Sequence, residues 1–261
     1  MKTQKITIIG SGNVAEAFAH ALNNSSNRVV QVYARNRERG EAVAAIAGAS
    51  WCGKAEELEA ADLYLICVSD RAIADVAASL PFAAGSVVAH TAGCGTLEML
   101  PEGTRRAIIY PFQTFSVGRV VDFSKIFLFV EAEDEDTKAQ ATTFAHTLTD
   151  NVAEADAALR AKIHLTGVIA CNFVNNLYAT AAEVLAEAGL PFDVVAPLIA
   201  ETAAKAIDST TPAAVQTGPA VRGDGATMNR HRALIGDNEL LKNIYDKISE
   251  NIWRLRETSK R

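Results

Sequence analysis

The first candidate site is a glycine-rich turn close to the start of the chain. Residues 6–15 read as a short apolar strand that leads into G-x-G-x-x-A and then into a helical pattern. Gly10 permits a tight turn, Gly12 lets the backbone approach a pyrophosphate, and Ala15 keeps helix and strand close. Free N–H groups and the dipole at the helix N-terminus favour bound phosphate. In preference to a purely structural turn, the pattern predicts dinucleotide binding by Gly10, Ser11, Gly12, Asn13 and Val14.

The residues after the second predicted strand bear on the choice of cofactor. This strand covers residues 29–34 and leads into Arg35, Asn36 and Arg37, where an NAD-binding fold would normally place an acidic residue for the ribose 2′-hydroxyl. Guanidinium groups can instead clamp a 2′-phosphate through two hydrogen bonds. The alternative is a solvated basic loop before a helix. We predict NADP as the cofactor, with Val68 and Ser69, at the end of a later apolar strand, as further contacts.

Histidine and asparagine side chains are the candidate catalytic groups. His90 follows a predicted strand and could polarise or protonate a substrate, or it could hold a neighbouring loop. His164 shares a long predicted helix with Asn172, Asn175 and Asn176. Either His164 donates a proton and the asparagines are structural, or the asparagines contact cofactor and substrate while His164 lies elsewhere in the cleft. His164 and Asn175 point the same way but lie roughly 16 Å apart along the helix axis. We predict catalytic roles for His90, His164 and Asn172.

Two further segments contain candidate substrate contacts. Residues 110–115 read Tyr-Pro-Phe-Gln-Thr-Phe, a composition suited to lining a cofactor edge or to ordinary loop packing. Gly218 and Pro219 precede an Arg-Gly-Asp sequence, in which Arg222 can hold an anion and Asp224 can cap a helix. The alternative is a capped helix with a surface arginine. We predict substrate binding by Gln113, Asn176, Arg222 and Asp224.

Composition narrows the class of protein. The 261 residues are 49% hydrophobic and 21% charged, with a net charge of −6, so a nucleic-acid partner is not expected. The four cysteines lack C-x-x-C spacing, and neither a disulfide framework nor a metal site is predicted. The N-terminus has no apolar signal core, and polar asparagines interrupt the longest apolar helix. We expect a cytoplasmic protein that acts on a small molecule and has no membrane partner.

The order of strand and helix patterns predicts an α/β fold with a doubly wound parallel sheet of the Rossmann type, followed by an all-helical C-terminal domain. We place an NADP-binding domain at residues 1–153 and a helical domain for substrate binding and dimerisation at 154–261. A helix from about residue 155 to 189 would bury a stripe of apolar residues, and Asp193 would cap the next helix. The apolar helices favour a symmetric homodimer. The predicted stripe is Leu165, Ile169, Phe173 and Leu177.

These motifs together resemble the NADP-oxidoreductase-like proteins that join a Rossmann domain to a C-terminal helical domain of unknown function. The similarity rests on the turn at residues 10–15, the segments 90–93 and 110–115, the helix with His164 and Asn172, and the loop 217–224. It implies an architecture like that of 6-phosphogluconate dehydrogenase, pyrroline-5-carboxylate reductase and ketopantoate reductase. The chain departs from the β-hydroxyacid dehydrogenases because it lacks their helix lysine one turn before an asparagine.

Three functions are compatible with these patterns. The first is an NADP(H)-dependent oxidoreductase that transfers hydride to or from a small carbonyl, imine or hydroxy compound. The second is a non-catalytic NADP(H)-binding protein that senses redox state, which NADPH turnover would distinguish from the first. The third is a methyltransferase, which would bind S-adenosylmethionine and not NADP.

Overall fold

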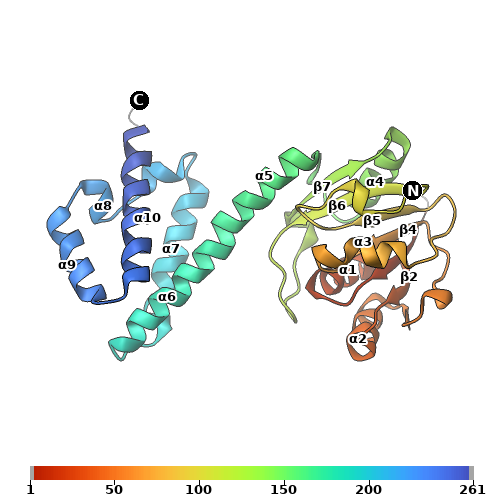
Figure 1. Ribbon diagram of the computed structural model, residues 1–261, viewed down its shortest axis with the longest axis horizontal. Coiled ribbons are helices and arrows are strands. Elements are labelled where there is room, and N and C mark those ends of the chain that lie inside the picture. Colours follow the sequence, from red (N-terminus) through yellow and green to blue (C-terminus); the bar gives the residue numbers. More distant parts are fainter. Residues whose placement is uncertain (1–2, 259–261) are drawn as a thin grey trace. The chain divides into compact units, whose positions relative to one another are not determined.

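The computed structural model describes residues 3–258 and divides into two compact units, residues 1–176 and 177–261. The first unit is built on one eight-stranded sheet with the strand order β3-β2-β1-β4-β5-β6-β7-β8 (Figure 1). Its strands are β1 Lys5–Ile9, β2 Arg28–Tyr33, β3 Ser50–Cys52, β4 Leu63–Ile66, β5 Val87–His90, β6 Arg105–Phe112, β7 Phe127–Ala132 and β8 Val152–Glu154.

The sheet confirms the predicted Rossmann class, with one correction. Adjacent strands run parallel except β6 and β7, which pair antiparallel from Ala107 with Ala132 to Phe112 with Phe127. The predicted parallel sheet therefore has one antiparallel strand pair, at β7. Only 14 residues separate β6 from β7 and they contain no α-helix, so a helical crossover to a parallel strand is absent there.

Helices cover both faces of the sheet. They are α1 Asn13–Asn23, α2 Arg37–Ala47, α3 Ile73–Ala78 and α4 Glu135–His146, and the chain continues after β8 into α5 Ala157–Gly167. The central strand β4 explains the layering, because its side chains alternate between two separate cores. Leu63 and Leu65 pack with Phe18 and Phe144, whereas Tyr64 and Ile66 pack with residues of α3. All four β4 residues are buried, as the continuous apolar run predicts.

The second unit is helical. Its helices are α6 Val174–Glu187, which begins within the first unit, α7 Ala196–Asp208, α8 Pro219–Arg222, α9 Gly225–Ile235 and α10 Glu239–Thr258. α10 packs against α8 and α9. Asp193 does not cap α7, contrary to expectation: it lies in the 3₁₀ turn Phe192–Val194, and α7 begins after Val195 with a proline in its first turn.

The predicted buried stripe on the long helix is also corrected. α5, a π-helical turn Val168–Phe173 and α6 follow one another directly, so the helix is continuous as expected. Leu165, Ile169, Phe173 and Leu177, however, are 55%, 53%, 58% and 36% exposed. Periodicity identified an apolar face correctly, but it could not show what covers that face. Within residues 3–258, no helix is long and apolar enough to cross a bilayer.

Candidate functional site

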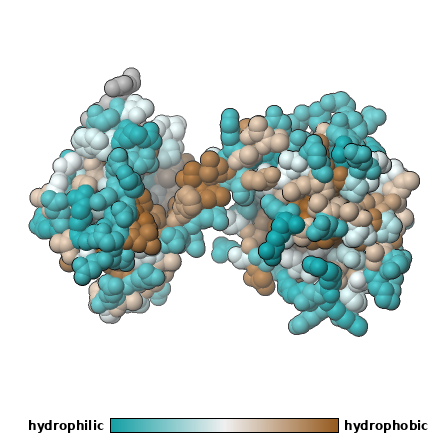
Figure 2. Space-filling view, in the orientation of Figure 1, coloured by the Kyte–Doolittle hydropathy of each residue, from teal (hydrophilic) through white to brown (hydrophobic). Residues whose placement is uncertain are grey.

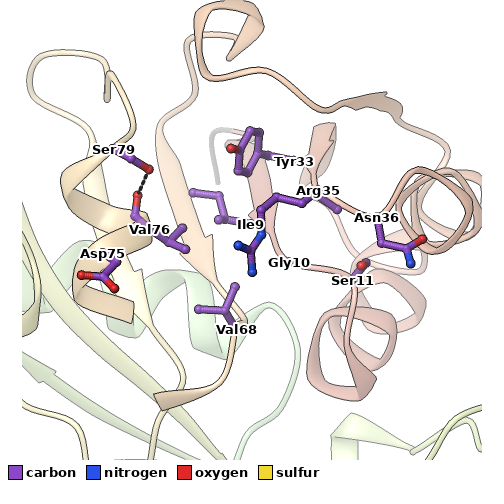
Figure 3. A pocket seen from close by; sticks show the side chains of 11 residues that line it. Ile9, Gly10, Ser11, Tyr33, Arg35, Asn36, Val68, Asp75, Val76 and Ser79 are labelled. Carbon is purple, nitrogen blue, oxygen red and sulfur yellow. Dashed lines mark hydrogen bonds between the residues drawn. The ribbon is translucent and has the colours of Figure 1, made fainter. Parts of the chain in front are cut away.

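A cavity of about 390 Å³ opens where β1, β2 and β4 end (Figure 3). One wall is the turn after β1, with Gly10 and Ser11, and the opposite wall is α3, with Asp75 and Val76. Ligands of open α/β sheets bind at this carboxyl edge, at the point where the strand order reverses. β1 lies between β2 and β4 at that reversal, so the cavity occupies the expected place for a nucleotide.

The two glycines of the turn have different reasons to lack a side chain. Gly10 has φ +119°, and a Cβ there would lie 2.4 Å from the carbonyl oxygen of Cys67. Its N–H donates to the Tyr33 carbonyl at 2.8 Å, which ties the turn to the neighbouring strand. Gly12 is the N-cap of α1, and a Cβ there would meet nothing within 4 Å. The space in front of the α1 N-terminus is therefore open to a phosphate, and this fits a dinucleotide.

Arg35 reaches into the cavity from the end of β2. Its guanidinium extends over Gly10 toward Val68 in Figure 3, and no hydrogen bond or ion pair joins it to another residue in the described range 3–258. Asn36 also lines the cavity, but its side chain caps α2 by accepting from the Arg39 N–H at 3.0 Å. Arg35 is thus a free cation beside the phosphate-binding turn.

Arg37 does not line this cavity. Its guanidinium pairs with Glu41 at 2.9 Å and lies 5.3 Å from the centre of the Trp51 ring. The two arginines that sequence reasoning treated alike therefore differ, because Arg37 is in the first turn of α2 while Arg35 precedes its N-cap.

Two other predicted cofactor contacts, Asn13 and Val14, have local roles in this structure. The Asn13 side chain donates to the Phe115 carbonyl at 2.9 Å, and so ties α1 to the segment after β6. Glu16, one turn further on, accepts from the Gly118 N–H at 3.0 Å and from Arg39 at 2.7 Å, and these donors hold the pKa of its carboxyl below the usual value. Val14 packs against the core, and Ser69 is exposed beyond β4.

His90 is fully buried, and both ring nitrogens have partners. The Ala92 N–H donates to Nδ1 at 3.2 Å, so Nε2 carries the hydrogen and donates to the Thr96 carbonyl at 3.1 Å. Burial lowers the pKa of His90 to about 4, while the Thr96 hydrogen bond opposes that shift. These contacts favour the loop-holding alternative, and we do not propose His90 as a catalytic group.

A second cavity, of about 330 Å³, lies at the end of β6. It is lined by Tyr110, Phe112, Gln113, Thr114, His164, Gly167, Val168, Cys171 and Asn172. His164 Nδ1 lies 3.1 Å from the Tyr110 hydroxyl, so a strand and a helix each contribute one member of a hydrogen-bonded pair. Three of the predicted site residues, Gln113, His164 and Asn172, thus line one cavity.

Glycines let the two elements approach at this cavity. A Cβ on Gly93 would lie 2.6 Å from His164 Nδ1 and 2.9 Å from Tyr110 Cζ. A Cβ on Gly167 would lie 2.9 Å from the Phe112 ring. Gly93 is therefore the residue of segment 90–93 that matters most for this cavity, because its lack of a side chain leaves room for His164 and Tyr110.

The π-helical turn helps to bring Asn172 to the cavity. In a straight α-helix, residues eight apart point about 80° away from one another. The i→i+5 turn at Val168–Phe173 winds less per residue and so reduces this angle between His164 and Asn172. Such turns are frequent at functional sites. The sequence showed no signal for this turn.

Sequence reasoning also missed Arg160, one helical turn before His164. Its side chain is fully buried, ion-paired with Glu131 and hydrogen-bonded to the carbonyls of Gly95 and Ala155. Its Nε has no partner among residues 3–258. Burial raises the pKa of Tyr110 to about 12, with Cys94 and Asp70 adding to the rise and the Arg160 charge opposing it. From the sequence, an arginine on an apolar helix is expected at the surface. Only the structure shows that Arg160 is buried.

The remaining predicted substrate contacts lie at or beyond the junction of the units. Asn176 is the last residue of the first unit. Asp224 caps α9, as predicted, by accepting from the N–H and the hydroxyl of Thr227 at 3.0 and 2.7 Å. Arg222 ends α8 in the second unit. Its contact with a substrate stays a prediction.

Two families match successive parts of the chain. Residues 5–93 match the family described as NADP oxidoreductase, coenzyme F420-dependent, and residues 126–252 match a domain of unknown function, DUF2520. A candidate NADP oxidoreductase from Bacteroides fragilis is 34% identical with a TM-score of 0.88, and the match covers 97% of this chain and 98% of that one. The chain therefore belongs to the NADP-oxidoreductase-like family that joins these two domains, which confirms the resemblance.

More distant structures share the fold. An imine reductase from a Pseudomonas species is 17% identical over 99% of this chain and 95% of that one, with a TM-score of 0.67. A reductive aminase from Aspergillus terreus, in complex with NADPH and ethyl-5-oxohexanoate, is 15% identical over 96% of this chain and 95% of that one, with a TM-score of 0.66. No curated protein matches the chain.

Proposed function

We propose that this protein is an NADP(H)-dependent oxidoreductase that transfers hydride to or from a small carbonyl, imine or hydroxy compound. The observation that carries the proposal is the free Arg35 guanidinium in a cavity beside the Gly10–Gly12 turn. Family membership and the nicotinamide-dependent enzymes among its structural relatives support an oxidoreductase. The Gly12 N-terminus of α1 would hold the pyrophosphate and Arg35 the 2′-phosphate. The cofactor supplies the hydride chemistry.

The second cavity supports the assignment of the reacting groups. Its Tyr110–His164 pair lies at the end of β6, on the same edge of the sheet as the ends of β1, β2 and β4, because β1, β2, β4, β5 and β6 all run parallel. An extended dinucleotide that starts over β1 and β2 would direct its nicotinamide toward β5 and β6. We assign His164 to proton transfer, Asn172 and Gln113 to orientation of substrate or carboxamide, and Asn176 and Arg222 to the substrate side.

Calorimetric titration with NADP and NAD tests the cofactor. We expect NADP to bind at least ~10-fold more tightly, a difference of about 1.4 kcal/mol. Arg35→Ala should abolish most of that preference by weakening NADP binding alone. Arg37→Ala is the matched control, because Arg37 is paired with Glu41 and does not line the cavity, and it should preserve the preference. Equal affinities for NADP and NAD in the unmodified protein would overturn the proposal.

We also propose that a second copy of the chain covers the exposed apolar face of the long helix. Leu165, Ile169 and Phe173 recur every four residues and are each more than half exposed. The brown side chains near the middle of Figure 2 lie along this helix. A contiguous apolar surface of this kind is typical of an interface between subunits. A monomer mass in light scattering at micromolar concentration would contradict the homodimer.

A further inference from the structure

We propose that Tyr110 fixes His164 in one tautomer and that the pair relays a proton to an oxygen substrate, a carbonyl or hydroxyl compound. The inference rests on the proposed function and goes beyond it by naming the proton source and the substrate class. The 3.1 Å contact between Tyr110 Oη and His164 Nδ1 carries it.

The direction of this hydrogen bond follows from the surroundings of Tyr110. Tyr110 is 9% exposed, and His164 is the one recorded hydrogen-bond partner of its hydroxyl in the range 3–258. If Nδ1 carried the hydrogen, the Tyr110 O–H would have no protein acceptor among residues 3–258, and an unpaired hydroxyl costs about 1–3 kcal/mol where water is excluded. Tyr110 therefore donates to Nδ1. The hydrogen of a neutral His164 ring then resides on Nε2, the nitrogen that the Tyr110 contact leaves available.

This arrangement suits delivery of a proton to a developing alkoxide. The cofactor, when bound, would supply the hydride to a carbonyl carbon. His164 Nε2 would then give its proton to the oxygen that receives the C=O electron pair. Nδ1 takes the Tyr110 proton, so the imidazole stays neutral and Tyr110 becomes a phenolate. The pair is reset when Nε2 takes a proton from solvent and Nδ1 returns its proton to the Tyr110 oxygen. In the oxidation of an alcohol the same protons move in reverse.

The charges around the pair keep the relayed proton on Tyr110 in the resting state. Burial keeps Tyr110 protonated at neutral pH, with its pKa raised to about 12, so the proton is present when needed. The buried cation of Arg160 acts on Tyr110 in the direction that stabilises its anion, while Asp70 and Cys94 act against it. None of the residues that line the cavity is acidic, whereas an iminium substrate would be best stabilised by an adjacent carboxylate. An oxygen substrate therefore fits better than an iminium.

The tautomer can be measured without any substrate. Ring ¹⁵N chemical shifts of ¹⁵N-histidine-labelled protein distinguish Nε2–H from Nδ1–H, and His164→Asn assigns the signal. We expect Nε2–H for His164 in the unmodified protein and a mixture of tautomers in Tyr110→Phe. The second unit offers a matched control, because His231 Nδ1 lies 2.9 Å from the Tyr245 hydroxyl. Tyr245→Phe should change the His231 signal alone. An Nδ1–H tautomer at His164, or no change in Tyr110→Phe, would overturn the relay.

The substrate class is tested by NADPH oxidation with two sets of probes. Cyclohexanone and ethyl pyruvate represent carbonyls, and 2-methyl-1-pyrroline represents imines. We expect turnover of a carbonyl probe, a kcat about 10²-fold lower in Tyr110→Phe with KM little changed, and no change in Tyr245→Phe. Turnover of the imine alone, or a carbonyl rate insensitive to Tyr110→Phe, would overturn the inference. Absence of NADP binding would instead contradict the proposed function. The ¹⁵N measurement would still test whether Tyr110 fixes the tautomer of His164, because it needs neither cofactor nor substrate.

Discussion

Mild acid should destabilise this protein through His90. The fully buried imidazole has a pKa lowered from 6.5 to about 4, because burial penalises its charged form. The unfolded chain binds a proton at pH below 6.5 while the folded chain does not, so the folded state loses stability as the pH falls. The loss starts near pH 6.5 and is complete near pH 4.

The size of the effect follows from the shift. A shift from 6.5 to about 4 corresponds to about 3 kcal/mol at full effect, and to about 2 kcal/mol between pH 7.5 and 5. Between pH 7.5 and 5 the change in stability comes mainly from His90. The carboxyl groups whose pKa values are lowered titrate below their ordinary values of 4.5 or 3.8, which lie outside this interval. They are Glu16, Glu98, Asp122, Asp134 and Asp224.

Urea unfolding at pH 7.5, 6.5, 5.5 and 5.0 measures this loss directly. In His90→Asn the amide can still accept from Ala92 but does not titrate, so the variant should be less stable at pH 7.5 yet lose about 2 kcal/mol less on acidification. His146→Gln is the control at an exposed histidine and should follow the unmodified protein. An unfolding free energy that is flat from pH 7.5 to 5, or equal slopes in His90→Asn and the unmodified protein, would refute the argument.

Four further outcomes are expected. Gly93→Ala should separate Tyr110 from His164 and abolish turnover while NADP affinity in calorimetry stays unchanged, since its Cβ would lie 2.6 Å from His164 Nδ1; retained turnover would contradict this. Gly10→Ala should lower the unfolding free energy in urea by about 1–3 kcal/mol because of its positive φ, and an unaltered midpoint would count against the strain. Arg160→Met should leave Glu131 unpaired and lower the thermal midpoint, whereas an equally stable variant would show that this buried ion pair contributes little. Phe173→Glu should shift the mass in light scattering from dimer to monomer, and an unchanged dimer would place the interface elsewhere.

Local patterns predicted the nucleotide-binding half of the molecule well. Strand and helix alternation, the buried run of β4 and the glycine turn each follow from spacing and residue type over a few positions. Asp224 was recognised as a helix cap for the same reason. The short strands β3 and β8 and the helix α4 were missed, since three-residue strands have no measurable period and α4 has a weakly apolar face.

Features that depend on distant residues could not be read from the sequence. His90 and His164 look equally reactive in the chain, and only packing shows that Ala92 and Thr96 occupy the first while the second meets Tyr110. Arg35 and Arg37 likewise differ only in their neighbours, because Glu41 pairs with Arg37 alone. The π-helical turn that helps to bring Asn172 to the cavity has no compositional signature.

A crystal structure of the protein with NADP⁺ bound would test the central claim most directly. We predict that the 2′-phosphate lies within hydrogen-bonding distance of the Arg35 guanidinium, with the pyrophosphate over Gly12 and the nicotinamide ring facing the cavity of Tyr110 and His164. A 2′-phosphate held by Arg37 and not Arg35, or a nicotinamide directed away from β6, would contradict the account.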